Sequence, residues 1–231
     1  MSKIILVLGM HRSGTSCLTG CLQENGVNFP NVSIENKYNK KGNRENNEVM
    51  MLNDEILLFN NSTWDKPLFE TLHWNLSHEH KGRAILAKYG ELNQSQYIGF
   101  KDPRFIFTIH FWMKLIESPV LVASIRSPYA VAQSLNRRDV GFSVHQGLDL
   151  WLAYNNQLLA ILKKNPFPLI SFDSTDVEYT DKLSNLMQGL QLEPPYKTTF
   201  FETELRVNGA SMDGVLDKRM VSCYHDLTSY L

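Results

Sequence analysis

Short, mostly apolar runs recur along the chain, and longer segments with a helical spacing of apolar residues separate them. The runs cover residues 4–8, 97–100, 120–125 and 169–172. The first and third are rich in β-branched residues, which is typical of strands buried on both faces of a parallel sheet. Parallel strands that alternate with helices are joined by right-handed crossovers, so the pattern predicts an α/β fold with a parallel sheet.

Segments with apolar residues at three- and four-residue spacing predict the helices between these runs. Their expected spans are 17–22, 45–59, 77–92, 103–112, 128–138, 143–164, 176–190 and 212–231. We expect Ser77 to cap the third of these helices. Pro103 and Pro128 are expected to occupy first turns, where the missing N–H of proline costs nothing. The polar stretch 26–42 is expected to form a long surface loop.

The composition fits one domain over residues 1–231 and gives no bulk electrostatic reason for a charged partner. The formal net charge is −1, so we expect neither a nucleic acid nor an anionic membrane as partner. Three cysteines suggest no disulfide framework and fit a reducing compartment. Cys17 and Cys21 lie one helical turn apart with no histidine pair nearby, which favours packing over metal binding. Because no stretch approaches about 20 apolar residues, we expect a soluble cytoplasmic protein.

The segment GMHRSGTS, residues 9–16, has the features of an anion-binding loop between the first strand and the first helix. Gly9 and Gly14 permit a tight turn, and the N–H groups that open the helix have no helical acceptor. Such a helix N-terminus binds anions, and Arg12 adds a permanent charge whose forked donors suit phosphate or sulfate. The alternative is an ordinary strand-to-helix turn whose serine and threonine residues cap the helix.

This loop lacks the lysine that a nucleotide kinase requires. A Walker A loop reads G-x-x-x-x-G-K-[ST]; Gly9, Gly14 and Ser16 match it, but Thr15 replaces the lysine. A kinase also usually needs an aspartate that holds magnesium after a strand. A P-loop nucleotide or small-molecule kinase with a degenerate Walker A loop is therefore the alternative rather than the favoured reading.

Cationic residues follow three of the predicted strands at the point where each strand ends. They are Arg12, Lys101, Arg104 and Arg126. The ligand crevice of a parallel α/β sheet lies at the carboxyl ends of its strands, so these cations are expected to converge there. The alternative is that each one pairs with a nearby carboxylate such as Asp102 or Asp139. Four such cations in a nearly neutral chain favour an anionic ligand.

Four segments together resemble sulfotransferases that use 3′-phosphoadenosine-5′-phosphosulfate (PAPS). The loop with Arg12 before Ser-Gly-Thr is similar to the phosphosulfate loop of that family. The sequence Arg126-Ser-Pro, followed by Ser134 and Arg138, is similar to its 3′-phosphate-binding segment. Residues 101–104 (KDPR) and 39–45 (NKKGNRE) resemble segments of the tyrosylprotein and bacterial carbohydrate-type branch.

The resemblance implies a P-loop three-layer α/β/α fold with a central parallel sheet of about four to five strands. It implies transfer of a sulfuryl group from PAPS, without a metal, to an acceptor hydroxyl that we expect on a glycan. The implied catalytic residues are Glu45 as base, Lys101 and Arg12. The implied donor-binding residues are His11, Arg12, Ser13, Gly14, Thr15, Ser16, Arg126, Ser134, Arg138 and Arg206.

The sequence departs from the family at two places and leaves one role open. Phe172 stands where many members have a tyrosine near the nucleotide, and a late basic loop is reduced to residues 206–209, from which Arg206 is carried over. An alternative for Glu45 is a first-turn acid stabilised by the helix dipole, with Glu48 and His11 as other candidates for the base. A binding module without catalysis is a third reading of the chain, which the intact site residues argue against.

Overall fold

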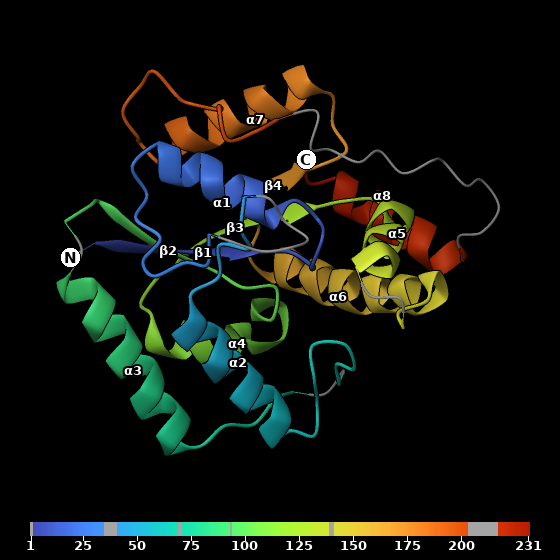
Figure 1. Cartoon of the computed structure of the whole chain (residues 1–231), viewed down its shortest axis with the longest axis horizontal. Helices are drawn as coiled ribbons and strands as arrows, with labels where there is room; N and C mark the ends of the chain where they lie inside the picture. Colours follow the sequence, from blue (N-terminus) through green and yellow to red (C-terminus); the bar gives the residue numbers. More distant parts are fainter. Residues whose placement is uncertain (1, 35–40, 69–70, 93, 139–140, 203–216) are drawn as a thin grey trace.

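The computed structural model has a four-stranded parallel sheet at its centre (Figure 1). The structure describes residues 2–34, 41–68, 71–92, 94–138, 141–202 and 217–231. The strands are β1 (Lys3–Leu8), β2 (Tyr97–Lys101), β3 (Val120–Ile125) and β4 (Leu169–Ser171), in the order β2-β1-β3-β4. Every adjacent pair is parallel. The predicted α/β class and parallel sheet are confirmed, with four strands in the described part of the chain.

Strand β1 occupies an inner position and leads directly into the glycine-bracketed loop. Its side chains from Ile5 to Leu8 are fully buried, at 0% exposure. It pairs with β2 through Ile5 and Gly99, and with β3 through Val7 and Val122. Because all strands run in one direction, the segments that follow β1, β2 and β3 meet at one edge of the sheet.

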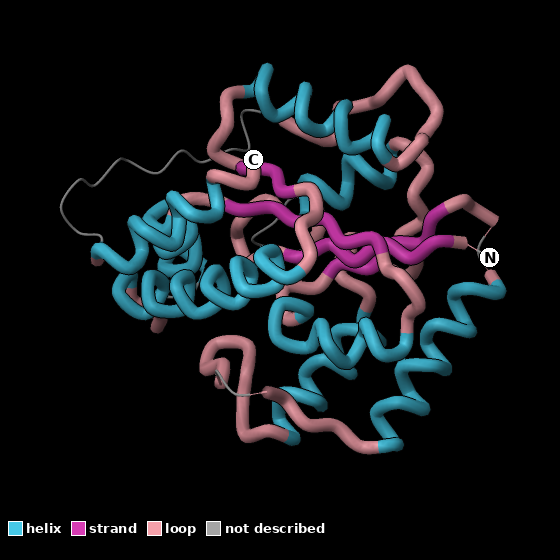
Figure 2. Tube along the Cα trace, turned by 180° about the vertical axis from the view of Figure 1, so that it is seen from behind, coloured by secondary structure: helices cyan, strands magenta, loops and turns pink. Residues whose placement is uncertain are grey.

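Helices cover both faces of the sheet and give three layers (Figures 1 and 2). On one face lie α1 (Thr15–Glu24) and α7 (Asp176–Gly189), whose Leu18 and Leu183 join one apolar cluster with Ile5 of β1. The opposite layer contains α2 (Asn47–Phe59), α3 (Leu76–Glu91), α4 (Phe105–Leu115) and α6 (Val144–Lys164). A larger apolar cluster that includes Trp112 and Trp151 fills that side.

Two further helices, α5 (Pro128–Arg138) and α8 (Lys218–Thr228), pack against α6. The predicted last helix, 212–231, is confirmed over α8, while its expected first residues, 212–216, lie outside the described residues. Among the helices that the structure describes, none combines the length and the apolar character that a membrane crossing requires.

Helix starts show where local hydrogen bonds override the predicted boundaries. The expected cap Ser77 is wrong: Asn75 caps α3, because its side chain accepts from the His78 N–H while His78 Nδ1 accepts from the Asn75 N–H. Pro103 lies in a turn, and α4 begins only at Phe105. The prediction for Pro128 is confirmed, since α5 begins there.

Candidate active site

The loop after β1 has backbone geometry that its two glycines make possible. Gly9 has φ 135° and Gly14 has φ 91°, both in the left-handed region that favours glycine. A Cβ added at Gly9 would lie 2.4 Å from the Ser124 carbonyl oxygen, and one at Gly14 would lie 2.5 Å from the Phe172 ring. Arg12 also adopts a positive φ of 68°, so the loop turns sharply and places the start of α1 at the sheet edge.

Ser13 ties this loop to β3. Its hydroxyl lies 2.6 Å from the Met10 carbonyl oxygen and 3.1 Å from that of Ser124. The Ser124 hydroxyl donates in return to the Ser13 carbonyl oxygen at 2.6 Å. Ser13 is buried at 2% exposure, so the structure places it beneath the binding surface, where it holds the loop against the neighbouring strand.

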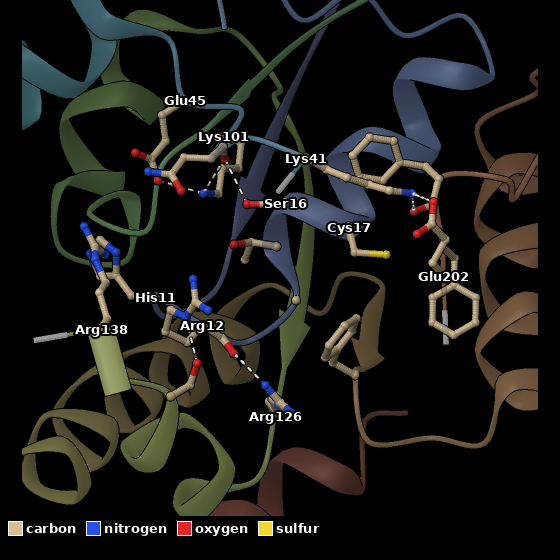
Figure 3. A pocket seen from close by; sticks show the side chains of 17 residues that line it. His11, Arg12, Ser16, Cys17, Lys41, Glu45, Lys101, Arg126, Arg138 and Glu202 are labelled. Carbon is tan, nitrogen blue, oxygen red and sulfur yellow. Dashed lines mark hydrogen bonds and ion pairs between the residues drawn. The ribbon is translucent and has the colours of Figure 1, made fainter. Parts of the chain in front are cut away.

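One cavity opens at the start of α1 and brings most of the predicted site residues together (Figure 3). Of the predicted residues, it is lined by His11, Arg12, Gly14, Thr15, Ser16, Glu45, Lys101, Arg126, Ser134 and Arg138. Ser13 lies beneath this surface, and Arg206 lies outside the described residues. Three strand ends and α5 therefore contribute to one site, as the parallel topology requires.

Guanidinium groups crowd one side of the cavity. Arg12 Nε donates to the Ser134 hydroxyl at 2.8 Å, and Arg126 Nη1 lies 3.5 Å from the Arg12 carbonyl oxygen. Burial, together with the charges of Arg138, Arg126 and Arg137, lowers the pKa of Arg12 to about 10. Arg12 remains charged at neutral pH, and a bound anion would relieve this repulsion between like charges.

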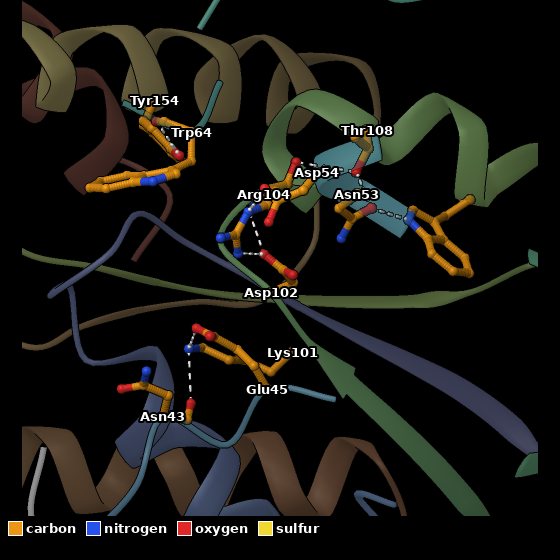
Figure 4. Close-up of polar contacts among 11 residues, drawn as sticks. Asn43, Glu45, Asn53, Asp54, Trp64, Lys101, Asp102, Arg104, Thr108 and Tyr154 are labelled. Carbon is orange, nitrogen blue, oxygen red and sulfur yellow. Dashed lines mark hydrogen bonds and ion pairs between the residues drawn. The ribbon is translucent and has the colours of Figure 1, made fainter. Parts of the chain in front are cut away.

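Lys101 and Glu45 form a buried ion pair on another side of the cavity (Figures 3 and 4). Lys101 Nζ lies 2.7 Å from Glu45 Oε1 and donates to the Asn43 carbonyl oxygen at 3.0 Å. Their exposures are 3% and 8%. The Ser16 hydroxyl donates to the same Asn43 carbonyl at 2.9 Å, so this backbone oxygen joins the loop of β1 to the end of β2.

Arg104 takes the alternative role foreseen for the strand-end cations, that of a partner to carboxylates. Its Nη1 lies 3.1 Å from Asp102 Oδ1, and its Nε lies 2.5 Å from Asp54 Oδ1 on α2. It does not line the cavity. Asp102 is fully buried, and this burial raises its pKa against the opposing effect of the Arg104 charge.

The other candidates for the base differ from Glu45 in their surroundings. Glu48 does not line the cavity and pairs with Lys88 of α3 instead. The His11 ring lies 4.8 Å from that of Trp64 and 5.9 Å from that of Tyr154. Burial and the nearby cations, Arg104 foremost, lower the pKa of His11 well below its usual value. Glu45 is thus the candidate whose carboxylate is both in the cavity and paired with a lysine.

The sequence analysis missed an aromatic and charged wall at the other end of the cavity. Phe200 and Phe201 line it together with Phe172. Lys41 Nζ lies 4.4 Å from the centroid of the Phe200 ring and 2.8 Å from Glu202 Oε1. Phe172 directly follows β4, and Lys41 lies in the segment 39–45 described above. Phe200, Phe201 and Glu202 follow no strand, and the adjacent pair Phe200-Phe201 is the one signal that the sequence offered for them.

The described residues contain no group of three or more His, Cys, Asp or Glu side chains placed to hold a metal ion. Cys21 is buried in the apolar cluster of α1, and Cys17 borders the cavity. The cations that line the cavity are Arg12, Lys41, Lys101, Arg126 and Arg138.

Comparisons with known proteins identify the fold. No protein-family model matches the chain, and no curated protein matches its sequence. Among solved structures, the sulfotransferase domain from the Synechococcus PCC 7002 olefin synthase is similar, with a TM-score of 0.54 and 15% sequence identity. The match covers 96% of this chain and 84% of that domain. The chain therefore has the α/β fold of a sulfotransferase domain, as the sequence analysis predicted.

Proposed function

We propose that this protein is a PAPS-dependent sulfotransferase that acts on an acceptor hydroxyl. The observation that carries the proposal is the convergence of Arg12, Arg126 and Lys101 on the start of α1 in one cavity. Free N–H groups at a helix N-terminus and forked guanidinium donors both favour phosphate and sulfate groups. The likeness of the fold to a sulfotransferase domain supports the same conclusion.

The cavity suits a donor that carries negative charge at two separate places. The loop of β1, with Arg12 and the Ser16 hydroxyl, would hold the 5′-phosphosulfate. Arg126, Ser134 and Arg138 would hold the 3′-phosphate, because α5 and the end of β3 present them together. The aromatic wall of Phe172, Phe200 and Phe201 would cover the apolar faces of the donor's adenine ring.

The reaction forms a bond between the acceptor oxygen and sulfur and breaks the bond between sulfur and the 5′-phosphate oxygen. Adenosine 3′,5′-bisphosphate leaves with the electron pair of the broken bond, so negative charge grows on its 5′-phosphate. Arg12, Lys101 and the loop N–H groups are positioned where such charge would be stabilised, and preorganised donors of this kind are usually the largest catalytic contribution.

Glu45 would accept the proton of the attacking hydroxyl. Its contact with Lys101, at 2.7 Å, orients the carboxylate. The alternative role, a first-turn acid of α2, belongs to Glu48 instead, because α2 begins at Asn47 with Asn46 as its cap. The glycan acceptor and the cytoplasmic location stay predictions from the sequence.

The decisive experiment compares sulfuryl transfer from PAPS by the wild type and by Glu45→Gln. We expect turnover to fall about 10²–10⁴-fold, the usual range for loss of a general base. The dissociation constant of adenosine 3′,5′-bisphosphate, measured by calorimetry, should change less than about twofold, because the base contacts the acceptor rather than the nucleotide.

Glu48→Gln is the matched control and should keep wild-type turnover. Near-normal turnover of Glu45→Gln would exclude Glu45 as the base. Tight binding of ATP with magnesium, without binding of adenosine 3′,5′-bisphosphate, would overturn the sulfotransferase proposal in favour of a kinase.

A further inference from the structure

Helix α2 is tied to the end of β2 by two separate ion pairs (Figure 4). One is the buried pair of Glu45, just before α2, with Lys101, the last residue of β2. The other joins Asp54, within α2, to Arg104 in the turn that follows β2. Both pairs thus connect the same two elements, one at the cavity and one away from it.

The second pair is anchored on the sheet side by Asp102. Asp102 Oδ1 accepts from the Arg104 backbone N–H at 2.8 Å and from Arg104 Nη1 at 3.1 Å. Asp102 is fully buried, and Arg104 is only 8% exposed. Asp102 therefore holds the Arg104 guanidinium on the sheet side, and Arg104 Nε donates to Asp54 Oδ1 at 2.5 Å on the α2 side.

Next to Asp54, Asn53 connects α2 to α4 through uncharged groups. Its Oδ1 accepts from the Thr108 hydroxyl and from Trp112 Nε1, both at 2.8 Å. Thr108 and Trp112 belong to α4, which follows Arg104. The middle of α2 is thus fixed in position and in rotation relative to the β2–α4 turn.

We propose that Asp54 and Arg104 are positioning residues that set where Glu45 stands relative to Lys101 and the acceptor. This inference rests on the proposed function, in which Glu45 is the base. A helix transmits a displacement along its length, so release of Asp54 shifts or tilts the N-terminal end of α2 that Glu45 precedes. Misplacement of a reacting group by about 1 Å can cost about 10²-fold in rate.

Asp54 is the position at which this role can be separated from stability. Its side chain is 39% exposed, so Asp54→Asn leaves no buried charge at that position, whereas removal of Arg104 would leave Asp102 buried without its cation. Arg104 keeps its contact with Asp102 when Asp54 is replaced. Glu55→Gln is the matched control, because it also removes one acid from α2 but breaks a surface pair with Lys81 of α3.

We expect Asp54→Asn to lower kcat for sulfuryl transfer about tenfold, since it weakens one of the two contacts that fix the middle of α2 without removing the base. The dissociation constant of adenosine 3′,5′-bisphosphate and the thermal midpoint should stay close to those of Glu55→Gln. Glu55→Gln itself should keep wild-type kcat. Equal kcat in the two variants would overturn the inference.

A double-mutant cycle with Glu45→Gln tests whether Asp54 acts through the base. In single-turnover measurements, adding Asp54→Asn to Glu45→Gln should change the rate less than about twofold, because non-additive effects mark residues that act together. The same tenfold loss in both backgrounds would show a general structural effect and overturn the inference. Failure of the proposed function is seen separately, as near-normal turnover of Glu45→Gln alone.

Discussion

Individual side chains in the cavity differ in the partners of their charged groups. Lys101 lies beside Glu45, and Lys41 beside Glu202. Arg126 Nε lies 3.7 Å from Asp173 Oδ1, and Arg12 donates to the hydroxyl of Ser134. The pKa of Arg12 is lowered by burial and by neighbouring arginines, so an anion bound beside Arg12 would relieve the repulsion between these like charges.

Replacing Arg126 tests whether the arginine side of the cavity binds the 3′-phosphate of the donor. If it contacts the 3′-phosphate, Arg126→Ala should weaken adenosine 3′,5′-bisphosphate about ten- to a hundredfold, the equivalent of one charged hydrogen bond. Adenosine 5′-phosphate, which lacks that group, should be affected much less. Calorimetric titration of both ligands is the measurement, with Arg137→Ala, at an exposed position of α5, as control. Equal weakening of both ligands would contradict the assignment.

The lowered pKa of His11 predicts how the free energy of unfolding depends on pH. Its folded-state pKa is lowered well below 6.5 by burial and nearby cations, so the unfolded chain binds a proton that the folded protein excludes. The free energy of unfolding should then fall as pH drops below about 6.5, by up to about 1.4 kcal/mol per pH unit. Urea unfolding at pH 7.5 and 5.5 measures this loss.

His11→Phe should flatten this pH dependence, because the ring keeps its place beside Trp64 without a titrating nitrogen. His110→Phe, at an exposed position of α4, should leave it as in the wild type. A wild-type slope in His11→Phe would show that other groups cause the loss.

At the scale of elements, the cap of α2 positions the residue before it. Asn46 accepts from the N–H groups of Glu48 and Val49, and its side-chain amide donates to the Pro30 carbonyl oxygen at 2.8 Å. It is 1% exposed. The start of α2, and hence the neighbouring Glu45, is held between the helix and the segment that follows α1.

Two cap variants separate helix stability from catalysis. Asn46→Ala and Asn75→Ala each remove the side-chain cap of a helix, α2 or α3, and each should lower the free energy of unfolding by about 1 kcal/mol. Turnover should fall in Asn46→Ala only, because Asn46 directly follows Glu45, whereas neither Asn75 nor its helix α3 lines the cavity. Urea unfolding and steady-state rates measure the two effects, and equal turnover in both variants would contradict a positioning role for the α2 cap.

Strands were easier to predict than caps and long-range contacts. Both faces of the sheet are buried, Ile5 in one apolar cluster and Leu6 in the other, so the apolar runs mark their strands directly. The cap at Asn75 depends on reciprocal bonds with His78 that periodicity does not contain. The pairing of Arg104 with Asp54, across fifty positions, depends on how α2 packs, which no local pattern specifies.

At the scale of the whole molecule, positive side chains gather at one edge of the sheet although the net charge of the chain is small. The chain has a net charge of −1, yet its parallel strands bring lysine and arginine side chains to one edge. Three of the four cations predicted from strand ends, Arg12, Lys101 and Arg126, line one cavity for this reason, whereas Arg104 pairs with Asp102 and Asp54. Phe200 could not be predicted, because its contact with Lys41 joins irregular segments that lie far apart in the sequence.

This concentration of positive charge predicts that sulfuryl transfer needs no added metal. The arginine and lysine groups, together with the loop N–H groups, supply the stabilisation that a bridging cation gives in phosphoryl transfer. Turnover with PAPS should be unchanged in excess EDTA. Loss of activity that magnesium restores would instead support a kinase.

The hydrogen bonds exchanged between Ser13 and Ser124 lock the backbone of the loop after β1 to the backbone of β3. Ser13 follows Arg12 in the loop, and Ser124 lies on β3 two residues before Arg126. Both bonds are buried, with oxygen–oxygen distances of 3.1 and 2.6 Å. The backbone positions of Arg12 and Arg126 are therefore set by the fold before a ligand arrives, and a ligand that contacts both residues does not have to draw them together.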